Sequence, residues 1–203
     1  MTTVLKSKNR GRFFLILLML VFIGPIIASY GLYYFRNYVP EILSNGTLIL
    51  PPLDLNKLPL YDTQNQKITL KKFGGDWVML YVEPEKCNKI CIDTLYKMRQ
   101  IRIRLGKDMD RVKRVILTYQ GFRDNTLNEY LQSLYKGTLH IQTPGSDLNK
   151  FLAKLPPHDR AIKTGHLYLV DPLGNVMMSY ELSQKPKDIY SDMKRLLKAS
   201  RIG

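Results

Sequence analysis

The sequence has few of the residues on which several protein classes depend. Among its 203 residues are two Cys, three His and one Trp. Two cysteines are too few for a small scaffold that disulfides hold together in place of a large core. The motifs GxxxxGK, HExxH and GxSxG are also missing. The chain therefore lacks the local signatures of P-loop nucleotide binding, zinc peptidases and α/β hydrolases.

Acidic residues are also in short supply. The chain has 17 Asp and Glu against 31 Lys and Arg, a formal charge of +14 at pH 7, and the segment before residue 37 contains no acid. This balance excludes a strongly acidic protein, and it favours nucleic acid, anionic lipid or an acidic protein as partner. Hydrophobic residues make up 45% of the chain, which excludes a disordered chain, and the length suits one domain with an appendage.

The longest uncharged stretch covers residues 13–35 and contains 23 residues. With a rise of about 1.5 Å per residue, a helix of this length crosses a bilayer. The sequence predicts four regions: a basic N-terminus at 1–12, a transmembrane anchor at 13–35, a tether at 36–57 and a folded domain at 58–203. A cleavable signal peptide is the alternative, but its apolar core usually has only about 7–15 residues, and a small-residue cleavage motif follows it.

Positive charges set the expected orientation of the anchor. Lys6, Lys8, Arg10 and Arg12 precede it, whereas Arg36 is the first charge after it. The positive-inside rule then places the N-terminus in the cytoplasm and the domain outside. We expect a single-pass protein of the bacterial inner membrane with a periplasmic domain; the alternative is the mitochondrial inner membrane, facing the intermembrane space. Export makes the lipid bilayer the expected partner and argues against nucleic acid.

The residues after the tether alternate between strand-like and helix-like patterns. Residues 77–82 form an apolar run typical of a buried central strand, and residues 87–105 carry apolar side chains at helical spacing. Asp124 is suited to cap a helix over 125–136. Further elements are expected as a hairpin around 59–61 and 67–70, strands at 112–118, 139–142, 166–170 and 176–180, and helices near 146–154 and 186–200. This order predicts an α/β fold, a thioredoxin-like mixed sheet flanked by helices.

Both cysteines follow the predicted central strand. Cys87 and Cys91 are four residues apart, at the expected start of the next helix. Sites in open α/β sheets form at the carboxyl ends of strands, and a helix N-terminus favours a thiolate. The spacing brings both sulfurs to one face of a helical turn. Such a pair can hold Cu(I), form a disulfide in an exported protein, or simply fill the core.

The cysteine motif, the order of elements and the anchor together resemble the Sco/SenC proteins of cytochrome c oxidase assembly. The stretches that carry the resemblance are WVMLYVEPEKCNKICIDTLYKMRQI, VKRVILT and HLYLVDPLGNVMMSY. The resemblance implies a thioredoxin-like fold, and it implies that Cys87 and Cys91 are the copper or redox pair. It further implies that the protein delivers copper to the binuclear site of oxidase subunit II or reduces the cysteines of that site. Subunit II or other oxidase assembly proteins are then its expected partners.

Two features depart from the family pattern. Ile92 follows the second cysteine, where the family usually has Pro, and Lys163 stands near the position of the family's third copper ligand, a His. His158 is the nearest substitute, because His166 is expected on a strand and His140 in a structural or exposed position. The candidate copper ligands are therefore Cys87, Cys91 and His158.

Three functions remain open at this point. The first is a Sco-like factor that assembles a copper-containing oxidase by Cu(I) delivery or thiol reduction. The second is a non-catalytic scaffold of oxidase assembly that keeps the fold without copper binding, and the third is a general periplasmic thiol–disulfide reductase. A thioredoxin-type enzyme normally has two residues between its cysteines. A peroxiredoxin would have Thr or Ser where Pro84 stands.

Overall fold

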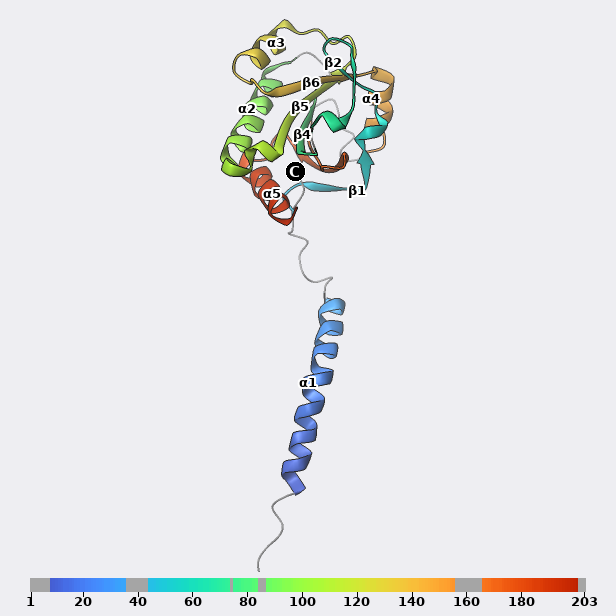
Figure 1. The fold of residues 1–203 in the computed structure, drawn as a ribbon, viewed down its shortest axis with the longest axis vertical. Helices are drawn as coiled ribbons and strands as arrows, with labels where there is room; N and C mark the ends of the chain where they lie inside the picture. The colour runs from blue at the N-terminus through green and yellow to red at the C-terminus, as the bar shows by residue number, and fades with distance from the viewer. Residues whose placement is uncertain (1–7, 36–43, 74, 84–86, 156–165, 201–203) are drawn as a thin grey trace, which may run out of the picture. The chain divides into compact units, whose positions relative to one another are not determined.

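In the computed structural model, the chain folds into two compact units, Met1–Leu43 and Ser44–Gly203. The structure describes residues 8–35, 44–73, 75–83, 87–155 and 166–200. Figure 1 shows the fold of both units.

Helix α1 (Lys8–Phe35) forms the described part of the first unit. Its segment Gly11–Gly31 has a mean hydropathy of 2.5, and none of that segment is buried in the structure. An exposed apolar helix of this length is unfavourable in water and suits a bilayer core. The predicted apolar helix over 13–35 is confirmed, while its orientation stays a prediction.

The second unit is built on one mixed sheet of eight strands in the order β1-β8-β7-β4-β5-β6-β2-β3. Strands β4, β5 and β6 run parallel, whereas β7 lies antiparallel to β4 on the other side. The strands are β1 (Thr47–Asp54), β2 (Leu60–Asp62), β3 (Lys67–Ile68), β4 (Trp77–Val82), β5 (Val112–Tyr119), β6 (Thr138–Thr143), β7 (His166–Val170) and β8 (Asn175–Glu181).

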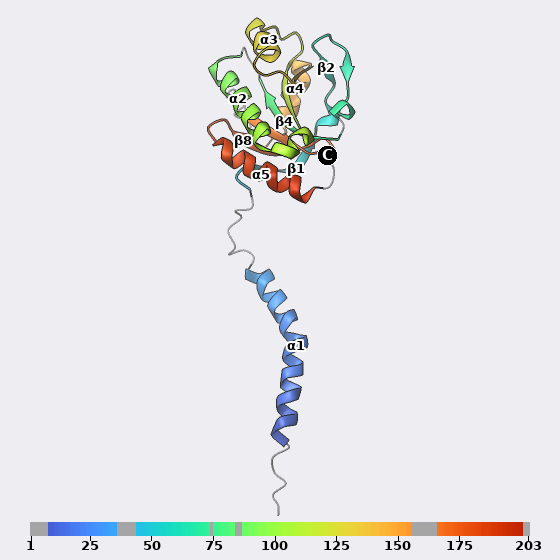
Figure 2. The same cartoon turned by 60° about the vertical axis from the view of Figure 1, so that its left-hand side comes forward.

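Helices cover both faces of this sheet (Figures 1 and 2). One face packs against α2, α3 and α5. The other face packs against α4 and the turn that follows β1. The α-helices are α2 (Lys89–Arg104), α3 (Asn125–Gln132), α4 (Gly145–Leu152) and α5 (Pro186–Ala199). The described residues of the unit also form the short 3-10 helices η2 (Leu55–Lys57), η3 (Leu70–Phe73) and η4 (Gly106–Arg111).

The central strand β4 contributes to both cores. Met79 and Tyr81 pack toward α2 and α5, while Val78 and Leu80 pack toward α4. Because both faces are covered, all six residues of β4 are buried, and the strand reads as an unbroken apolar run. The predicted α/β fold with a mixed sheet is confirmed. The predicted hairpin and the later strands and helices are present with ends shifted by a few residues, and α3 ends at Gln132 rather than near 136.

The folded unit begins earlier than the sequence predicts. Residues 36–57 are predicted as a tether, but Thr47–Asp54 form strand β1, which pairs antiparallel with β8. Pro51 and Pro52 are exposed in this strand, where its register with β8 is irregular. A strand at the edge of a sheet accepts proline, because its outer side needs no N–H donor. The prolines therefore mark an edge strand and not a linker.

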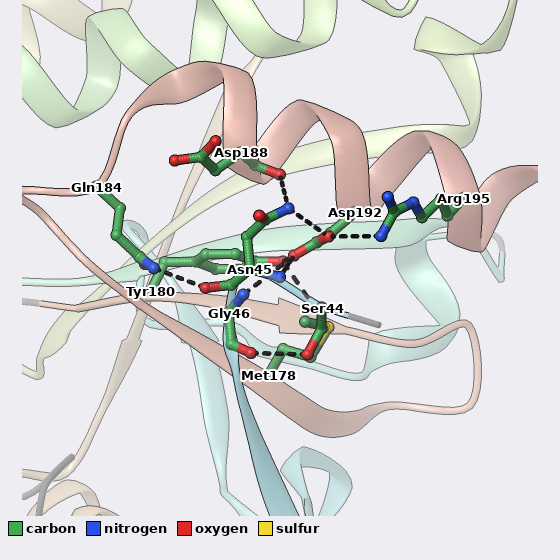
Figure 3. Close-up of polar contacts among 9 residues, drawn as sticks. All are labelled: Ser44, Asn45, Gly46, Met178, Tyr180, Gln184, Asp188, Asp192 and Arg195. Atoms are coloured by element: carbon green, nitrogen blue, oxygen red, sulfur yellow. Dashed lines mark hydrogen bonds and ion pairs between the residues drawn. The ribbon is translucent and has the colours of Figure 1, made fainter. Parts of the chain in front are cut away.

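A buried carboxylate fixes the start of this unit. Asp192 of α5 is only 2% exposed, and its Oδ2 accepts hydrogen bonds from the backbone N–H groups of Asn45 (2.7 Å) and Gly46 (3.0 Å). The Tyr180 hydroxyl donates to the same oxygen (3.0 Å), and the Asn45 amide donates to Oδ1 (2.9 Å). Figure 3 shows these groups converging on Asp192. The carboxylate thus links the first residues of this unit and strand β8 to helix α5.

Candidate redox site

Cys87 and Cys91 form a disulfide, with their Cα atoms 5.2 Å apart. Cys87 lies just before α2 and Cys91 lies in its first turn, after the carboxyl end of β4. The predicted position of the pair is confirmed by this arrangement. Sites in α/β folds form at this end of the sheet because the strands stop there and the loops open to solvent.

Asn88 determines where α2 begins. Its side chain accepts hydrogen bonds from the backbone N–H groups of Ile90 (2.8 Å) and Cys91 (3.2 Å), and its own backbone is extended. This N-cap leaves Cys87 outside the helix, so that its sulfur turns back onto that of Cys91. After reduction, the helix dipole and the N–H groups of the first turn favour a thiolate at this position.

The two sulfur-bearing residues differ in exposure. Cys91 is 0% exposed and packs in the core with Leu95 and Met98, whereas Cys87 is only partly buried against the same core. Thiol–disulfide exchange requires an attacking sulfur to reach its target. A substrate can therefore reach Cys87 directly, and Cys91 is placed to act on Cys87 from inside.

Asp124 connects the cysteine segment to α3. Its Oδ2 accepts a hydrogen bond from the Cys87 backbone N–H (2.8 Å), and its Oδ1 accepts one from Leu127 (3.1 Å), which caps α3 as predicted. One carboxylate thus holds the more accessible cysteine and the start of a neighbouring helix. Its negative charge opposes a thiolate on Cys87, and the α2 dipole favours one. The sequence indicated only the helix cap, because the contact with Cys87 spans 37 residues.

A second carboxylate is buried at the end of β4. Glu83 is 4% exposed and accepts a hydrogen bond from the Tyr81 hydroxyl (2.8 Å). Burial raises the pKa of Tyr81, and the charge and hydrogen bond of Glu83 raise it further. The phenol therefore remains a donor at physiological pH. The sequence showed Glu83 as a charge near the pair, but its burial follows from the sheet, which no local pattern reveals.

Among the described residues, neither His140 nor His166 forms a metal-binding group with the cysteines. On β7, Leu167 and Leu169 face α2 and α5, while Tyr168 packs toward α4. His166 lies beside the Tyr168 ring, at 6.1 Å between centroids, and alternation along the strand places it on that same face. It therefore lies on the opposite side of the sheet from Cys91. His158 lies outside the residues that the structure describes.

His140 on β6 has a structural role. Its Nε2 lies 2.9 Å from the Thr118 hydroxyl, and its ring packs edge-on against Phe122. Among the described residues, no group of three or more His, Cys, Asp or Glu side chains is placed to hold a metal ion. The donors that the described part of the site offers to copper are the two sulfurs, which suit Cu(I).

His140 predicts a measurable acid sensitivity. Burial lowers its pKa from 6.5 to about 4. Between these values the unfolded chain binds a proton that the folded protein does not, so stability falls as the pH drops from about 6.5 to 4. Since the residue is partly exposed, we expect a loss of about 2 kcal/mol.

Urea unfolding at neutral pH and near pH 4.5 would measure this effect in the wild type and in His140→Gln. The carboxylates titrate in both proteins, so the difference between the two pH dependences isolates His140. The variant should lose less stability on acidification. Equal losses in the two proteins would show that the ring does not resist protonation.

Family comparisons agree with this architecture. Residues 77–200, more than half of the chain, match the model of a transmembrane-like, thioredoxin-like C-terminal domain. The chain belongs to this transmembrane-like, thioredoxin-like family. Residues 6–36 match the corresponding transmembrane-like N-terminal domain, which covers the apolar part of α1. No curated protein sequence matches the chain.

Solved structures with the same fold include several Sco proteins. Copper-bound yeast Sco1 is 20% identical with a TM-score of 0.54, and the match covers 73% of this chain and 92% of that one. BsSco, a member of the Sco family of cytochrome c oxidase assembly proteins described for its disulfide switch, is 17% identical (TM-score 0.55; 74% and 96% covered). A thiol:disulfide interchange protein from Bacteroides sp. is 12% identical (TM-score 0.50; 78% and 93% covered).

At these identities the likeness establishes the fold. The predicted resemblance to Sco proteins is confirmed at that level, and this family member combines a Sco-like thioredoxin fold with an apolar N-terminal helix.

Proposed function

We propose that this protein is a membrane-anchored, Sco-like thiol–disulfide reductant that prepares the copper-site cysteines of an oxidase subunit during assembly. The observation that carries the proposal is the unequal exposure of a disulfide at the start of α2, with Cys87 accessible and Cys91 buried. The similarity to an oxidase assembly protein described for its disulfide switch supports the choice of target. The N-terminal helix supports action at a membrane.

The reaction uses the reduced form of the pair. The Cys87 thiolate attacks one sulfur of a substrate disulfide, forming a Cys87–substrate bond, and the other substrate sulfur leaves as a thiolate. The Cys91 thiolate then attacks Cys87, the intramolecular disulfide forms, and the second substrate sulfur leaves. The substrate gains two electrons and the pair loses two, which gives the oxidised state of the structure. An external dithiol restores the reduced pair by the same exchange, with two electrons and two protons.

Cu(I) delivery is the second candidate. The reduced sulfurs of Cys87 and Cys91 form a two-coordinate site of the kind that Cu(I) accepts, and yeast Sco1 has been solved with copper bound. His158 stays the proposed third ligand. Copper binding and thiol reduction are compatible, because both require the reduced pair.

Trapping and complementation test the proposal. The full chain with Cys91→Ser should accumulate a mixed disulfide with an oxidase subunit in cells, and Cys87→Ser/Cys91→Ser should fail to support oxidase assembly. Full complementation by the double variant would overturn the proposal and leave a scaffold role. Many unrelated mixed-disulfide partners would instead indicate a general reductase. Titration of the reduced chain with Cu(I) against a chelator tests the second candidate, since binding should disappear in the double variant.

A further inference from the structure

The outer side of α5 carries an unusual row of cations around one aromatic ring. Lys187, Tyr190, Lys194 and Lys198 occur at spacings of three and four residues, which places them along one stripe of the helix. The three lysines are exposed and the tyrosine is partly buried. Helix α2 lies beside α5, as both cartoon views show, and adds Arg104 to this stripe.

Two of these cations converge on the same ring. The Arg104 guanidinium lies 4.9 Å from the centre of the Tyr190 ring, and the Lys194 ammonium lies 5.6 Å from it. Among the described residues, no carboxylate lies within ion-pair distance of Arg104 or of the three lysines. The negative face of the ring attracts both cations. Neither charge is neutralised by a described carboxylate, so both are available to an anionic surface.

A groove with a mixed polar and apolar lining adjoins this positive stripe. It has a volume of about 260 Å³ and runs between the last turns of α2 and the start of α5. Ile103 at its rim is 51% exposed. The lining residues are Gln100, Ile101, Ile103, Arg104, Pro186 and Tyr190. A ligand that matches this surface has an anionic group beside an apolar part.

We propose that the α2–α5 face binds the anionic phospholipid headgroups of the membrane that holds α1. Arg104 and Lys194 would attract headgroup phosphates, while Ile103 and Tyr190 would meet the boundary between headgroups and acyl chains. Basic side chains around exposed apolar and aromatic residues are the usual composition of a surface that binds anionic membranes. The inference rests on anchoring by α1 but not on the redox chemistry of the cysteines.

Chain length makes the membrane the favoured source of the phosphate. Eight residues, 36–43, join helix α1 to Ser44, and at full extension they reach no further than about 29 Å. A chain that is anchored by α1 therefore keeps the domain at a high effective concentration near one anionic surface. A free acidic protein has no such advantage.

The test uses the full chain in nanodiscs that carry a spin label on the lipid headgroups. Methyl NMR then reports how close the Ile103 side chain comes to the headgroups, through the relaxation that the spin label causes. Ile68 on β3, at the far edge of the sheet, is the internal reference. Nanodiscs with and without an anionic phospholipid are compared. Arg104→Gln/Lys194→Gln is the test variant, and Lys150→Gln/Lys154→Gln on and after α4 removes the same charge from another face.

We expect relaxation at Ile103 to be roughly fivefold greater in anionic than in neutral nanodiscs. The increase should vanish in the Arg104/Lys194 variant, persist in the Lys150/Lys154 variant, and disappear at about 1 M salt, where screening is nearly complete. Equal relaxation in both lipids, or an increase that survives in the Arg104/Lys194 variant, would overturn the proposal. Displacement of Ile103 from the headgroups by millimolar inorganic phosphate would identify a site for free anions instead. Thiol exchange by the cysteine pair should be the same in both kinds of nanodisc and in both variants.

Discussion

Replacement of Cys87 with serine is expected to reduce the rate at which the reduced protein attacks a small disulfide by on the order of 100-fold or more. The remaining cysteine, Cys91, is 0% exposed in the core, so it offers no thiolate that a substrate can reach. The Cys91→Ser variant should react at nearly the wild-type rate in the first step. It should then stop as a mixed disulfide, because no second sulfur releases the substrate.

Stopped-flow measurement with a chromogenic disulfide, followed by mass spectrometry of the products, would distinguish these two outcomes. The two variants are matched controls, since each removes one sulfur and keeps the other. Loss of the first step in Cys91→Ser, with its retention in Cys87→Ser, would reverse the assigned roles. Equal rates in both variants would show that exposure does not select the attacking cysteine.

The sequence predicted the location of the pair because two local signals coincide there. The apolar run Trp77–Val82 marks a strand covered on both faces, and the helical spacing of apolar residues over 87–105 marks the helix that follows. The N-cap at Asn88, which sets where α2 begins, was not predicted. A strand followed by a helix in an α/β fold places the intervening residues at the open end of the sheet. The position of Cys87 and Cys91 needed no long-range information.

The surroundings of the pair depended on contacts that no local pattern contains. Asp124 reaches the Cys87 N–H across 37 residues, and the face occupied by His166 follows from how β7 pairs with its neighbours. Strand β1 was missed for a related reason. Pro51 and Pro52 lower the strand propensity of Thr47–Asp54, but pairing with β8 at the sheet edge compensates for this low propensity.

The Asp192 cluster leads to the largest expected effect on stability. Asp192→Ala would leave two backbone N–H groups, of Asn45 and Gly46, and the buried hydroxyl of Tyr180 without their acceptor. Burial is the largest cause of the raised pKa of Tyr180 and remains in the variant, so that hydroxyl does not avoid the penalty by ionising. We expect a loss of about 3 kcal/mol in the free energy of unfolding, because buried donors without partners are costly. Chemical denaturation of the full chain in detergent measures it.

Asp188→Ala is the matched control, one helical turn earlier in α5. Asp188 takes part in the cluster only through its backbone carbonyl, which accepts from the Asn45 amide (3.3 Å), and its carboxylate points away from Asp192 in Figure 3. Its loss removes a favourable charge from the first turn of the helix and should cost less than about 1 kcal/mol. Equal losses in the two variants would contradict the central role of the Asp192 carboxylate.

The substitution Gly46→Ala should disturb the same cluster through Tyr180 and leave Asp192 in place. A Cβ atom on residue 46 would lie 2.5 Å from the Tyr180 ring and 3.0 Å from the Ser179 carbonyl oxygen, so the ring must shift, and this disturbs the hydrogen bond from its hydroxyl to Asp192. This variant keeps every charge and every backbone donor, yet it should lose a similar amount of stability. Because Asp192 binds the residues at which the folded unit begins, both changes should also open the chain near Asn45 to proteolysis before the rest of the sheet unfolds. Uniform cleavage throughout the domain would show that the cluster does not act locally.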